Sequence, residues 1–211
     1  VRDVAGNAGS VTDTTTLDTV APTVTVDSLK TNDTTPELTG TVNDPTAAVV
    51  VTVNGTPYTA TNNGDGTWTL ADNTLPTLPE GSVVVTATAT DTAGNQATGN
   101  GTLVIDLTPP SNGDGENSIQ FNDGGDEYVN AAESGSVTLA GKIAPDSLLN
   151  SISITDSLGT QLHVPLSDIS VDNQGVVTVS GQDLSALEDG PLTVVMTVTD
   201  AAGNTGTISD T

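Results

Sequence analysis

The sequence contains no cysteine, which excludes disulfide bonds and thiolate metal sites. Basic residues are nearly absent as well: three Lys or Arg stand against 27 Asp or Glu, a formal net charge of −24. Nucleic acid and anionic membranes are therefore not expected as partners, because both would repel the chain. Without disulfides, small extracellular domains need another stabilising element, and a hard metal ion held by carboxylates is the obvious candidate.

Aromatic residues and histidine are also scarce, and this argues against catalysis. Aromatics make up 2 % of the chain, so a core must be built from Val, Leu, Ile and Ala. The single histidine, His163, lies in an apolar, strand-like segment and is expected to be a strand side chain rather than a base. Paired carboxylates can hydrolyse glycosides, yet a sugar-binding groove would need more aromatics than Tyr58, Trp68, Phe121 and Tyr128. We therefore expect that the protein is not an enzyme.

Long hydrophobic runs are missing too. Apolar stretches are as short as residues 47–53, so no transmembrane helix and no membrane insertion are expected. We recognise no signal peptide in these residues either, and we expect the chain to open in mid-domain, as an excised fragment would. A length of 211 residues predicts one or two domains.

A repeated motif, D-x-A-G-N, organises the chain. Copies begin at Asp3, Asp91 and Asp200, and the first two are followed fifteen residues later by Asp18 and Asp106. The copies lie 88 and 109 residues apart, close to the roughly 100 residues of an immunoglobulin-like sandwich. We predict the last strand of an upstream Ig-like repeat at 1–18, an Ig-like sandwich at 19–106, and a second, longer one with a truncated last strand at 107–211.

Alternating Val/Thr segments separated by Gly, Asn, Asp and Pro predict about seven strands in each domain. In the first they fall near 23–27, 37–42, 47–53, 57–62, 67–71, 82–90 and 96–105, and in the second near 118–122, 136–143, 151–156, 161–166, 176–180, 192–199 and 204–210. Residues 63–66 form a hairpin turn, after which Trp68 is expected to anchor the core. The predicted fold is all-β: tandem immunoglobulin-like antiparallel β-sandwiches with Greek-key connections.

Successive strands of such a sandwich run in opposite directions. The segment leading into a domain, the loop between its second and third strands and the loop between its sixth and seventh strands therefore meet at one pole. The first acidic pole comprises Asp18, Asp44, Asp91 and Asn95; the second comprises Asp106, Asp146, Asp200 and Asn204. Converging carboxylates repel one another unless a cation lies among them.

Calcium suits these poles best, because it accepts six to eight oxygen ligands in irregular loops. Magnesium demands stricter geometry, and zinc would want His or Cys. A further candidate calcium loop holds Asp123, Asp126, Asn130 and Glu133, although its pattern is not that of an EF-hand. The alternative stays open in each case: Asp and Asn are common turn residues, and these clusters can be solvated acidic surface without metal.

Several motifs together resemble a known family. They are D-T-V-A-P at 18–22, T-P-E-L-T-G-T-V at 35–42, N-G-D-G-T-W-T-L at 63–70 and E-Y-V-N-A-A-E at 127–133. The chain resembles the bacterial immunoglobulin-like tandem repeats in the extender region of giant type I-secreted RTX adhesins, of the biofilm-associated and ice-binding kind. The resemblance covers nearly the whole sequence.

This resemblance implies a secreted protein of the bacterial cell surface whose repeats project distal ligand-binding domains. Its partners would be neighbouring repeats of the same chain, it would be monomeric, and calcium at the domain junctions would rigidify the rod. The implied ligands are Asp18, Asp44 and Asp91 at one junction and Asp106, Asp146 and Asp200 at the next. Two departures can shift the second set: D-L-T-P-P at 106–110 lacks the usual small residue before proline, and an acidic insert lengthens the start of the second domain.

The main alternative is a calcium-dependent ligand-binding module, lectin-like or for cell contact. Low aromatic content argues against it. The alternating threonines of residues 86–90 also suit an ice-binding face, but threonine is equally a good strand former on a solvated sheet.

Overall fold

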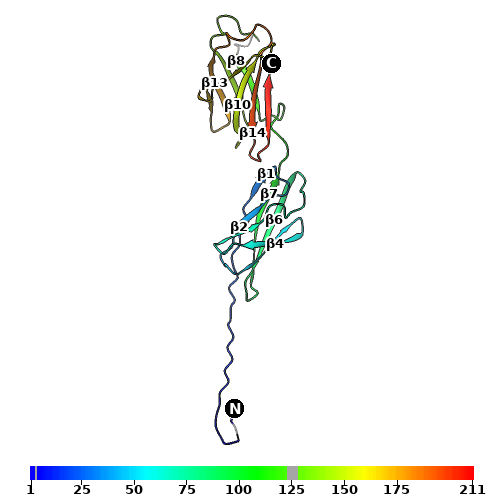
Figure 1. Cartoon of the computed structure of the whole chain (residues 1–211), viewed down its shortest axis with the longest axis vertical. Coiled ribbons are helices and arrows are strands. Elements are labelled where there is room, and N and C mark those ends of the chain that lie inside the picture. Colours follow the sequence, from blue (N-terminus) through cyan, green and yellow to red (C-terminus); the bar gives the residue numbers. More distant parts are fainter. Residues whose placement is uncertain (3, 123–127) are drawn as a thin grey trace. The chain divides into compact units, whose positions relative to one another are not determined.

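A computed structural model describes residues 1–2, 4–122 and 128–211 (Figure 1). Fifteen strands and one short 3-10 turn, η1 (Leu166–Asp168), make up the regular structure of these residues. No helix in the described part is long and apolar enough to cross a membrane. Contacts group the chain into two compact units: unit 1 holds Val1–Ser28, Glu37–Thr74 and Val83–Thr102, and unit 2 holds Leu29–Pro36, Leu75–Ser82 and Leu103–Thr211.

The first sandwich contains strands β1 to β7. They are β1 (Leu29–Thr31), β2 (Leu38–Thr41), β3 (Ala48–Val53), β4 (Thr56–Asn62), β5 (Thr67–Leu70), β6 (Gly81–Thr90) and β7 (Gln96–Ile105). Their order is β1-β7-β6-β3-β4-β5-β2. Strand β4 joins the two faces, because its first part pairs with β3 and its last two residues pair with β5.

The predicted strand at 23–27 takes a different form. Val24 makes an isolated bridge to Val42, and the amides of Thr25 and Asp27 donate to Thr41 and Thr39 at 2.9 and 3.0 Å. The chain then changes partners, and β1 runs parallel to β7, with Leu29 opposite Leu103. This parallel pair is the exception to the predicted antiparallel order, and no local pattern announces it, because β1 is only three residues long.

Trp68 is the centre of the first core, as predicted. Its side chain is fully buried, and its Nε1 donates to the carbonyl oxygen of Thr25 at 2.8 Å. The ring lies against Gly40, where an added Cβ would overlap both the indole and the Thr25 carbonyl. The glycine at position 40 is therefore required by the close approach of these two groups.

The second sandwich consists of two four-stranded sheets. One has the order β12-β13-β9-β8 and the other β11-β10-β14-β15. The strands are β8 (Ser118–Asn122), β9 (Val137–Lys142), β10 (Leu148–Thr155), β11 (Gln161–His163), β12 (Ile169–Val171), β13 (Val176–Gln182), β14 (Thr193–Thr199) and β15 (Thr205–Asp210). The sequence pattern missed β12, another three-residue strand.

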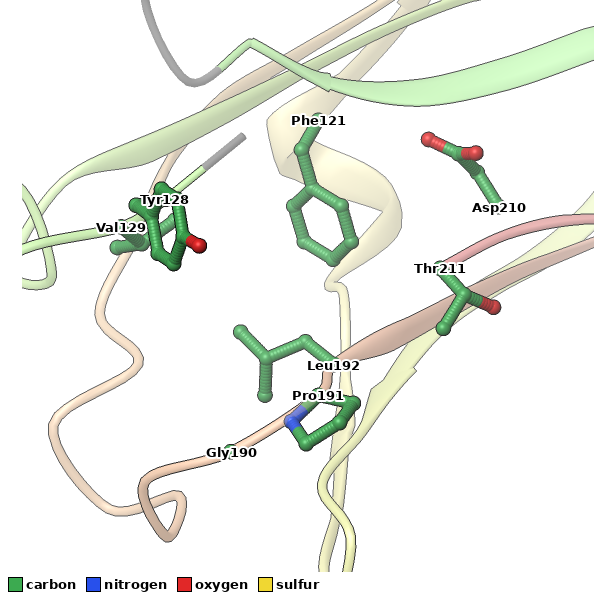
Figure 2. A pocket seen from close by; sticks show the side chains of 8 residues that line it. All are labelled: Phe121, Tyr128, Val129, Gly190, Pro191, Leu192, Asp210 and Thr211. Carbon is green, nitrogen blue, oxygen red and sulfur yellow. The ribbon is translucent and has the colours of Figure 1, made fainter. Parts of the chain in front are cut away.

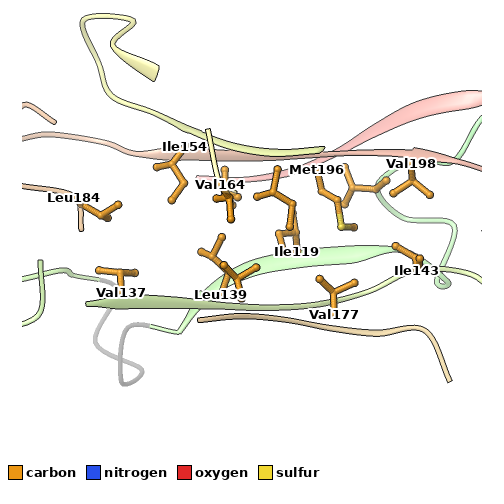
Figure 3. Close-up of a cluster of buried hydrophobic side chains, with 14 residues drawn as sticks. Ile119, Val137, Leu139, Ile143, Ile154, Val164, Val177, Leu184, Met196 and Val198 are labelled. Carbon is orange, nitrogen blue, oxygen red and sulfur yellow. The ribbon is translucent and has the colours of Figure 1, made fainter. Parts of the chain in front are cut away.

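Between the two sheets lies a core of aliphatic side chains (Figure 3). Its buried members are Ile119, Val137, Leu139, Ile143, Ile152, Ile154, Val164, Val177, Val179, Leu184, Val194, Met196, Val198 and Ile208. Strand β14 illustrates the pattern, with Val194, Met196 and Val198 inward and threonines between them. The all-β immunoglobulin-like fold is confirmed, and the buried members of this core are Ile, Val and Leu together with Met196.

The predicted domain limits at 18/19 and 106/107 remain predictions. Within the described residues of 1–18, the one β-bridge is that of Arg2 with Ala8. Unit 2 includes residues 29–36 and 75–82, so the compact units do not follow the repeat spacing of the sequence.

Candidate cation sites

The D-x-A-G-N turn at the first acidic pole is held by its own aspartate. Asp91 Oδ1 accepts hydrogen bonds from the amides of Ala93 and Asn95 at 2.9 and 2.8 Å, and Oδ2 accepts one from Asn95 Nδ2 at 2.8 Å. Gly94 supplies the positive φ of +93° that closes the turn. The Asn95 side chain, with these amides, holds the pKa of Asp91 below its usual value, so the carboxylate stays charged.

The segment leading into the first sandwich meets both loops of the first pole. Asn95 Nδ2 also donates to the carbonyl oxygen of Asp18 at 3.2 Å, and the amide of Thr23 donates to Asn43 Oδ1 at 2.7 Å. The predicted convergence of backbone segments is therefore present.

The carboxylates of the first pole, however, are each turned into their own loop. Asp44 Oδ1 accepts from both the amide and the hydroxyl of Thr46 at 2.8 Å, and Asp18 Oδ1 accepts from the amide of Val20 at 3.1 Å. These are the local bonds by which Asx turns form. Cation binding at this pole would have to compete with them.

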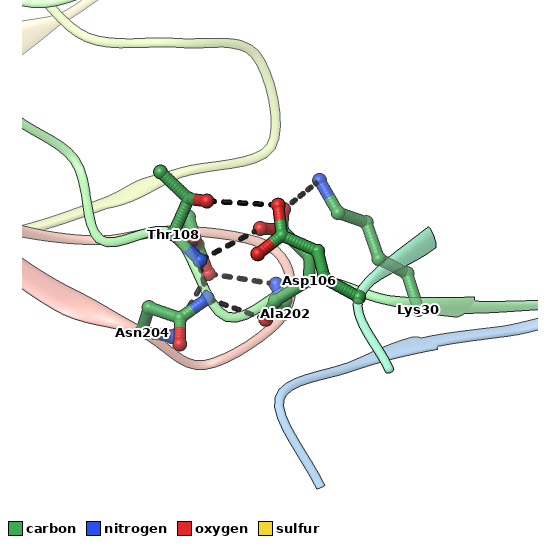
Figure 4. A network of polar contacts seen from close by, with 7 residues as sticks. Lys30, Asp106, Thr108, Ala202 and Asn204 are labelled. Atoms are coloured by element: carbon green, nitrogen blue, oxygen red, sulfur yellow. Dashed lines mark hydrogen bonds and ion pairs between the residues drawn. The ribbon is translucent and has the colours of Figure 1, made fainter. Parts of the chain in front are cut away.

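The second acidic pole repeats the same hydrogen bonding. Asp200 Oδ1 accepts from the amides of Ala202 and Asn204, both at 2.9 Å, and Oδ2 accepts from Asn204 Nδ2 at 3.0 Å. Asn204 Nδ2 also donates to the carbonyl oxygen of Asp106 at 2.8 Å (Figure 4). In the copies at Asp91 and Asp200, therefore, the motif asparagine links its turn to the backbone of the aspartate at the start of the same domain, Asp18 or Asp106.

Lys30 adds a feature that sequence reasoning missed. Its Nζ lies 3.0 Å from Asp106 Oδ2, while the amide of Thr108 donates to Asp106 Oδ1 at 3.1 Å (Figure 4). The Lys30 ammonium lowers the pKa of Asp106, and the hydrogen bond to Asp106 raises the pKa of Lys30, helped by the charges of Asp200 and Glu116. The rarity of lysine in this acidic chain was the signal that could have drawn attention to it.

A cavity of about 230 Å³ in unit 2 holds these charges. Its acidic lining residues are Asp106, Asp114, Glu116 and Asp200. Asp146 does not line it; that residue is exposed and has a φ of +61°. The acidic insert, residues 112–117, supplies Asp114 and Glu116 instead. Asn117 Oδ1 accepts a hydrogen bond from the amide of Ala144 at 3.1 Å, which ties the insert to the loop that carries Asp146.

The hydroxyl of Ser147 also lines this cavity. Its Oγ is buried and has no hydrogen-bond partner among the described residues. A buried hydroxyl without a partner costs free energy, so a water molecule or a cation in the cavity would satisfy it.

Asp114 is the most strongly perturbed carboxylate of the insert. Burial opposes its ionisation, but bonds from the Ser111 amide, the Asn117 side chain and the Glu116 amide outweigh burial and lower its pKa to about 2. Its ordinary pKa is 3.8, so its stabilising effect is complete above pH 4 and is lost as the pH falls towards 2.

Replacing Asp114 with asparagine is expected to lower the melting temperature at pH 7 by about 4 °C. The difference from the wild type should shrink between pH 4 and pH 2, where the native carboxylate takes up its proton. Thermal melts followed by circular dichroism across this range measure it. Asp146→Asn removes the same charge at an exposed position and serves as the control. A difference that stays constant down to pH 2 would contradict the assignment.

The donor atoms at both poles suit a hard cation, because they are carboxylate, amide and carbonyl oxygens. Among the described residues, no group of three or more His, Cys, Asp or Glu side chains is gathered closely enough to hold a metal ion. The poles thus bring the right oxygens into one region without a closed carboxylate cage. A cation there would need backbone oxygens and water as further ligands.

The third predicted calcium loop is only partly visible, since Asp123 and Asp126 lie outside the described residues. Asn130 and Glu133 bond each other within one turn: the Asn130 amide donates to Glu133 Oε2 at 3.0 Å, and Asn130 Oδ1 accepts from Ala132 at 2.9 Å. In the described part, these two side chains act as turn residues.

A larger cavity of about 810 Å³ lies in the second sandwich (Figure 2). Its lining residues are Phe121, Tyr128, Val129, Gly190, Pro191, Leu192, Asp210 and Thr211. Two of the four aromatic residues of the chain face this cavity, and Tyr128 is 75 % exposed.

Comparison with known proteins identifies the class. Residues 23–107 match the bacterial Ig-like domain family. The chain is similar to a solved structure of a 1.5-MDa bacterial ice-binding adhesin, described for host cell surface retention, with 26 % identity over 93 % of this chain and 65 % of that one, at a TM-score of 0.52. No curated protein matches the sequence significantly.

Two further structures are similar in sequence. One is a tetra-tandem repeat in the extending region of a large adhesion protein, with 27 % identity over 90 % of this chain and 48 % of that one, at a TM-score of 0.41. The other is a Ca²⁺-stabilised adhesin that helps an Antarctic bacterium reach out and bind ice, with 25 % identity over 99 % and 53 %, at 0.42. This chain spans 48 to 65 % of the length of these three structures.

Residues 23–107 thus form a bacterial Ig-like domain, and the chain as a whole is similar to a solved structure of a large bacterial adhesin. The predicted resemblance to Ig-like repeats of large bacterial adhesins is confirmed.

Proposed function

We propose that this chain is a structural extender segment of a secreted bacterial cell-surface adhesin, stiffened by calcium at its two acidic poles. The observation that carries the proposal is the duplicated turn: Asn95 and Asn204 each link a D-x-A-G-N loop to the carbonyl of Asp18 or Asp106. A repeated connection between a loop and the segment leading into its domain is what a tandem array needs to fix each junction.

Calcium would act at these poles by neutralising carboxylates that otherwise repel one another. At the first pole the ligands would come from Asp18, Asp44, Asp91 and Asn95. At the second they would come from Asp106 and Asp200, with Asp114 and Glu116 taking the part first assigned to Asp146. The net charge of −24 makes cation binding favourable at both.

The wider assignment follows from the same class. We propose repeat boundaries at 18/19 and 106/107, neighbouring repeats as the partners, a monomeric chain, and export by the type I route of RTX adhesins in a biofilm setting. Catalysis is not part of the proposal, since His163 is an exposed strand residue of β11.

Removing calcium is expected to make the chain more flexible and less heat-stable. Calcium at about 100 times its dissociation constant would stabilise each occupied site by about 2.7 kcal/mol, and chelation would remove this. Small-angle scattering should show a smaller radius of gyration in chelator, because a flexible array of repeats is on average shorter than a stiff one, and a melting curve should shift to lower temperature.

Magnesium at equal ionic strength is the control, because any salt screens the net charge of this chain. Unchanged scattering and melting on chelation would defeat the calcium role and leave the extender role to the protein contacts alone.

A calcium-dependent carbohydrate-binding module is the second candidate. The observation in its favour is the cavity lined by Phe121 and Tyr128, since sugar rings stack on aromatic faces (Figure 2). A glycan array with signal abolished by Tyr128→Ala would favour this function over the extender role.

A further inference from the structure

Lys30 is in an unusual position for this sequence. The chain has three basic residues, Arg2, Lys30 and Lys142, and Lys30 is the one that lines the cavity of the second pole. Its Nζ lies 3.0 Å from Asp106 Oδ2. Among the described residues, this is the one ion pair between side chains.

We propose that Lys30 is the built-in counter-ion of the second acidic pole and competes there with a divalent cation. The two poles, alike in their turns, then differ in calcium affinity: the first binds calcium without a competing basic residue, and the second binds it against the Lys30 ammonium. This inference rests on the proposed function for the first pole but concerns a residue that the repeat motif does not contain.

The geometry supports competition between Lys30 and calcium for the Asp106 carboxylate, and not a permanent block of calcium binding by Lys30. The Lys30 ammonium uses an oxygen of Asp106, the same carboxylate that would bind calcium, so binding would have to displace it or tolerate a like charge. The Lys30 side chain is 46 % exposed, which leaves it able to turn into solvent.

The cavity itself has room for an ion. Its volume of about 230 Å³ is several times the roughly 30 Å³ that a water molecule occupies in the liquid. The Asp114, Glu116 and Asp200 carboxylates and the unpartnered Ser147 hydroxyl would remain after the ammonium is removed. Shortening Lys30 to a neutral side chain should therefore convert this pole into a tighter divalent-cation site.

The test is a calcium titration of the ¹⁵N-labelled chain, of Lys30→Met and of Lys142→Met, followed by amide shifts. Ala93 and Asn95 report on the first pole, and Ala202 and Asn204 on the second, because their amides bond the motif aspartates. Lys142→Met removes the same charge from an exposed residue of β9 that does not line the cavity.

In Lys30→Met, the calcium midpoint at Ala202 and Asn204 should fall by about tenfold, since the ammonium repels a divalent cation at contact distance. Lys142→Met should titrate like the wild type. Equal second-pole midpoints in all three proteins would overturn the inference, and so would no response at the second pole in any of them.

The titration distinguishes a failure of the Lys30 inference from a failure of the proposed calcium role at the first pole. If the first pole fails to respond while the second pole of Lys30→Met does, calcium at the first pole is wrong and the role of Lys30 stands. If the first pole responds and Lys30→Met changes nothing, the reverse holds.

Discussion

Replacing Trp68 with alanine is expected to lower the free energy of unfolding of the first sandwich by about 3–5 kcal/mol. The indole is fully buried, lies against Gly40 and donates to the Thr25 carbonyl at 2.8 Å. Alanine would leave a cavity that the surrounding strands cannot fill, because the ring is the largest buried side chain of the molecule's described part. It would also leave the Thr25 carbonyl without this donor.

Trp68 is the single tryptophan, so urea unfolding has to be followed by circular dichroism or amide shifts rather than by fluorescence. Tyr58→Ala, at a half-buried position of β4, is the matched control and should cost about 1 kcal/mol. Trp68→Phe retains much of the buried ring and should fall between the two. A loss below about 1 kcal/mol for Trp68→Ala would show that this side chain does not anchor the core.

Replacing Asp200 with alanine is the second change with a large expected effect. Three hydrogen bonds end on this carboxylate, from the Ala202 amide and from the backbone and side chain of Asn204. Hydrogen bonds to charged groups contribute about 1.5–3 kcal/mol each, and their contributions do not add fully at a half-buried site. We expect a loss of about 3 kcal/mol, measured by urea unfolding in chelator so that bound metal plays no part.

Asp91→Ala removes the corresponding three bonds at the first pole and should also lower the urea midpoint, since the two turns match bond for bond. Asp189→Ala removes an exposed charge and should change stability by less than about 0.5 kcal/mol. If Asp200→Ala falls in the range of Asp189→Ala, the turn does not depend on its carboxylate, and the repeated motif would need a metal to explain it.

The Asp200→Ala variant also bears on function, because the turn that Asp200 holds makes contacts elsewhere in unit 2. The motif turn positions Asn204, whose side chain donates to the Asp106 carbonyl. A further bond, between backbone groups, runs from the Asn32 amide to the Ala202 carbonyl at 2.9 Å. Loss of the turn would therefore release two bonds that hold the loop of the second pole within unit 2.

Much of the fold could be predicted from the sequence, because strand periodicity is local. The limits of β7 and β8 agree with the prediction, and β3 to β6 agree within one residue at each end. Both elements that were missed, β1 and β12, are three residues long and too short to show an alternating pattern. They form because neighbouring strands offer unpaired edges, which a sequence does not display.

The candidate sites divide in the same way. The D-x-A-G-N turns at Asp91 and Asp200 depend on bonds within five residues, and the approach of Asp18 and Asp106 to these two turns follows from strand alternation. The sequence did not predict that Asp146 lies outside the cavity of the second pole. That arrangement involves a hydrogen bond from the Ala144 amide to Asn117, which is 27 residues away in the sequence. The contacts of an inserted loop depend on residues that are distant in the sequence, so a local pattern does not predict them.

By itself, then, the sequence determined the features that need no long-range contact: a chain without cysteine, strongly negative, folded into strands and closed by repeated aspartate turns. The tertiary structure alone decided which charges meet. Lys30 and Asp106 are adjacent because β1 pairs with β7, and three residues of pairing placed an ammonium where composition led us to expect a metal ion. The net charge of −24 indicates that an acidic pole favours a positive charge. Only the fold shows that, at the second pole, Lys30 supplies one.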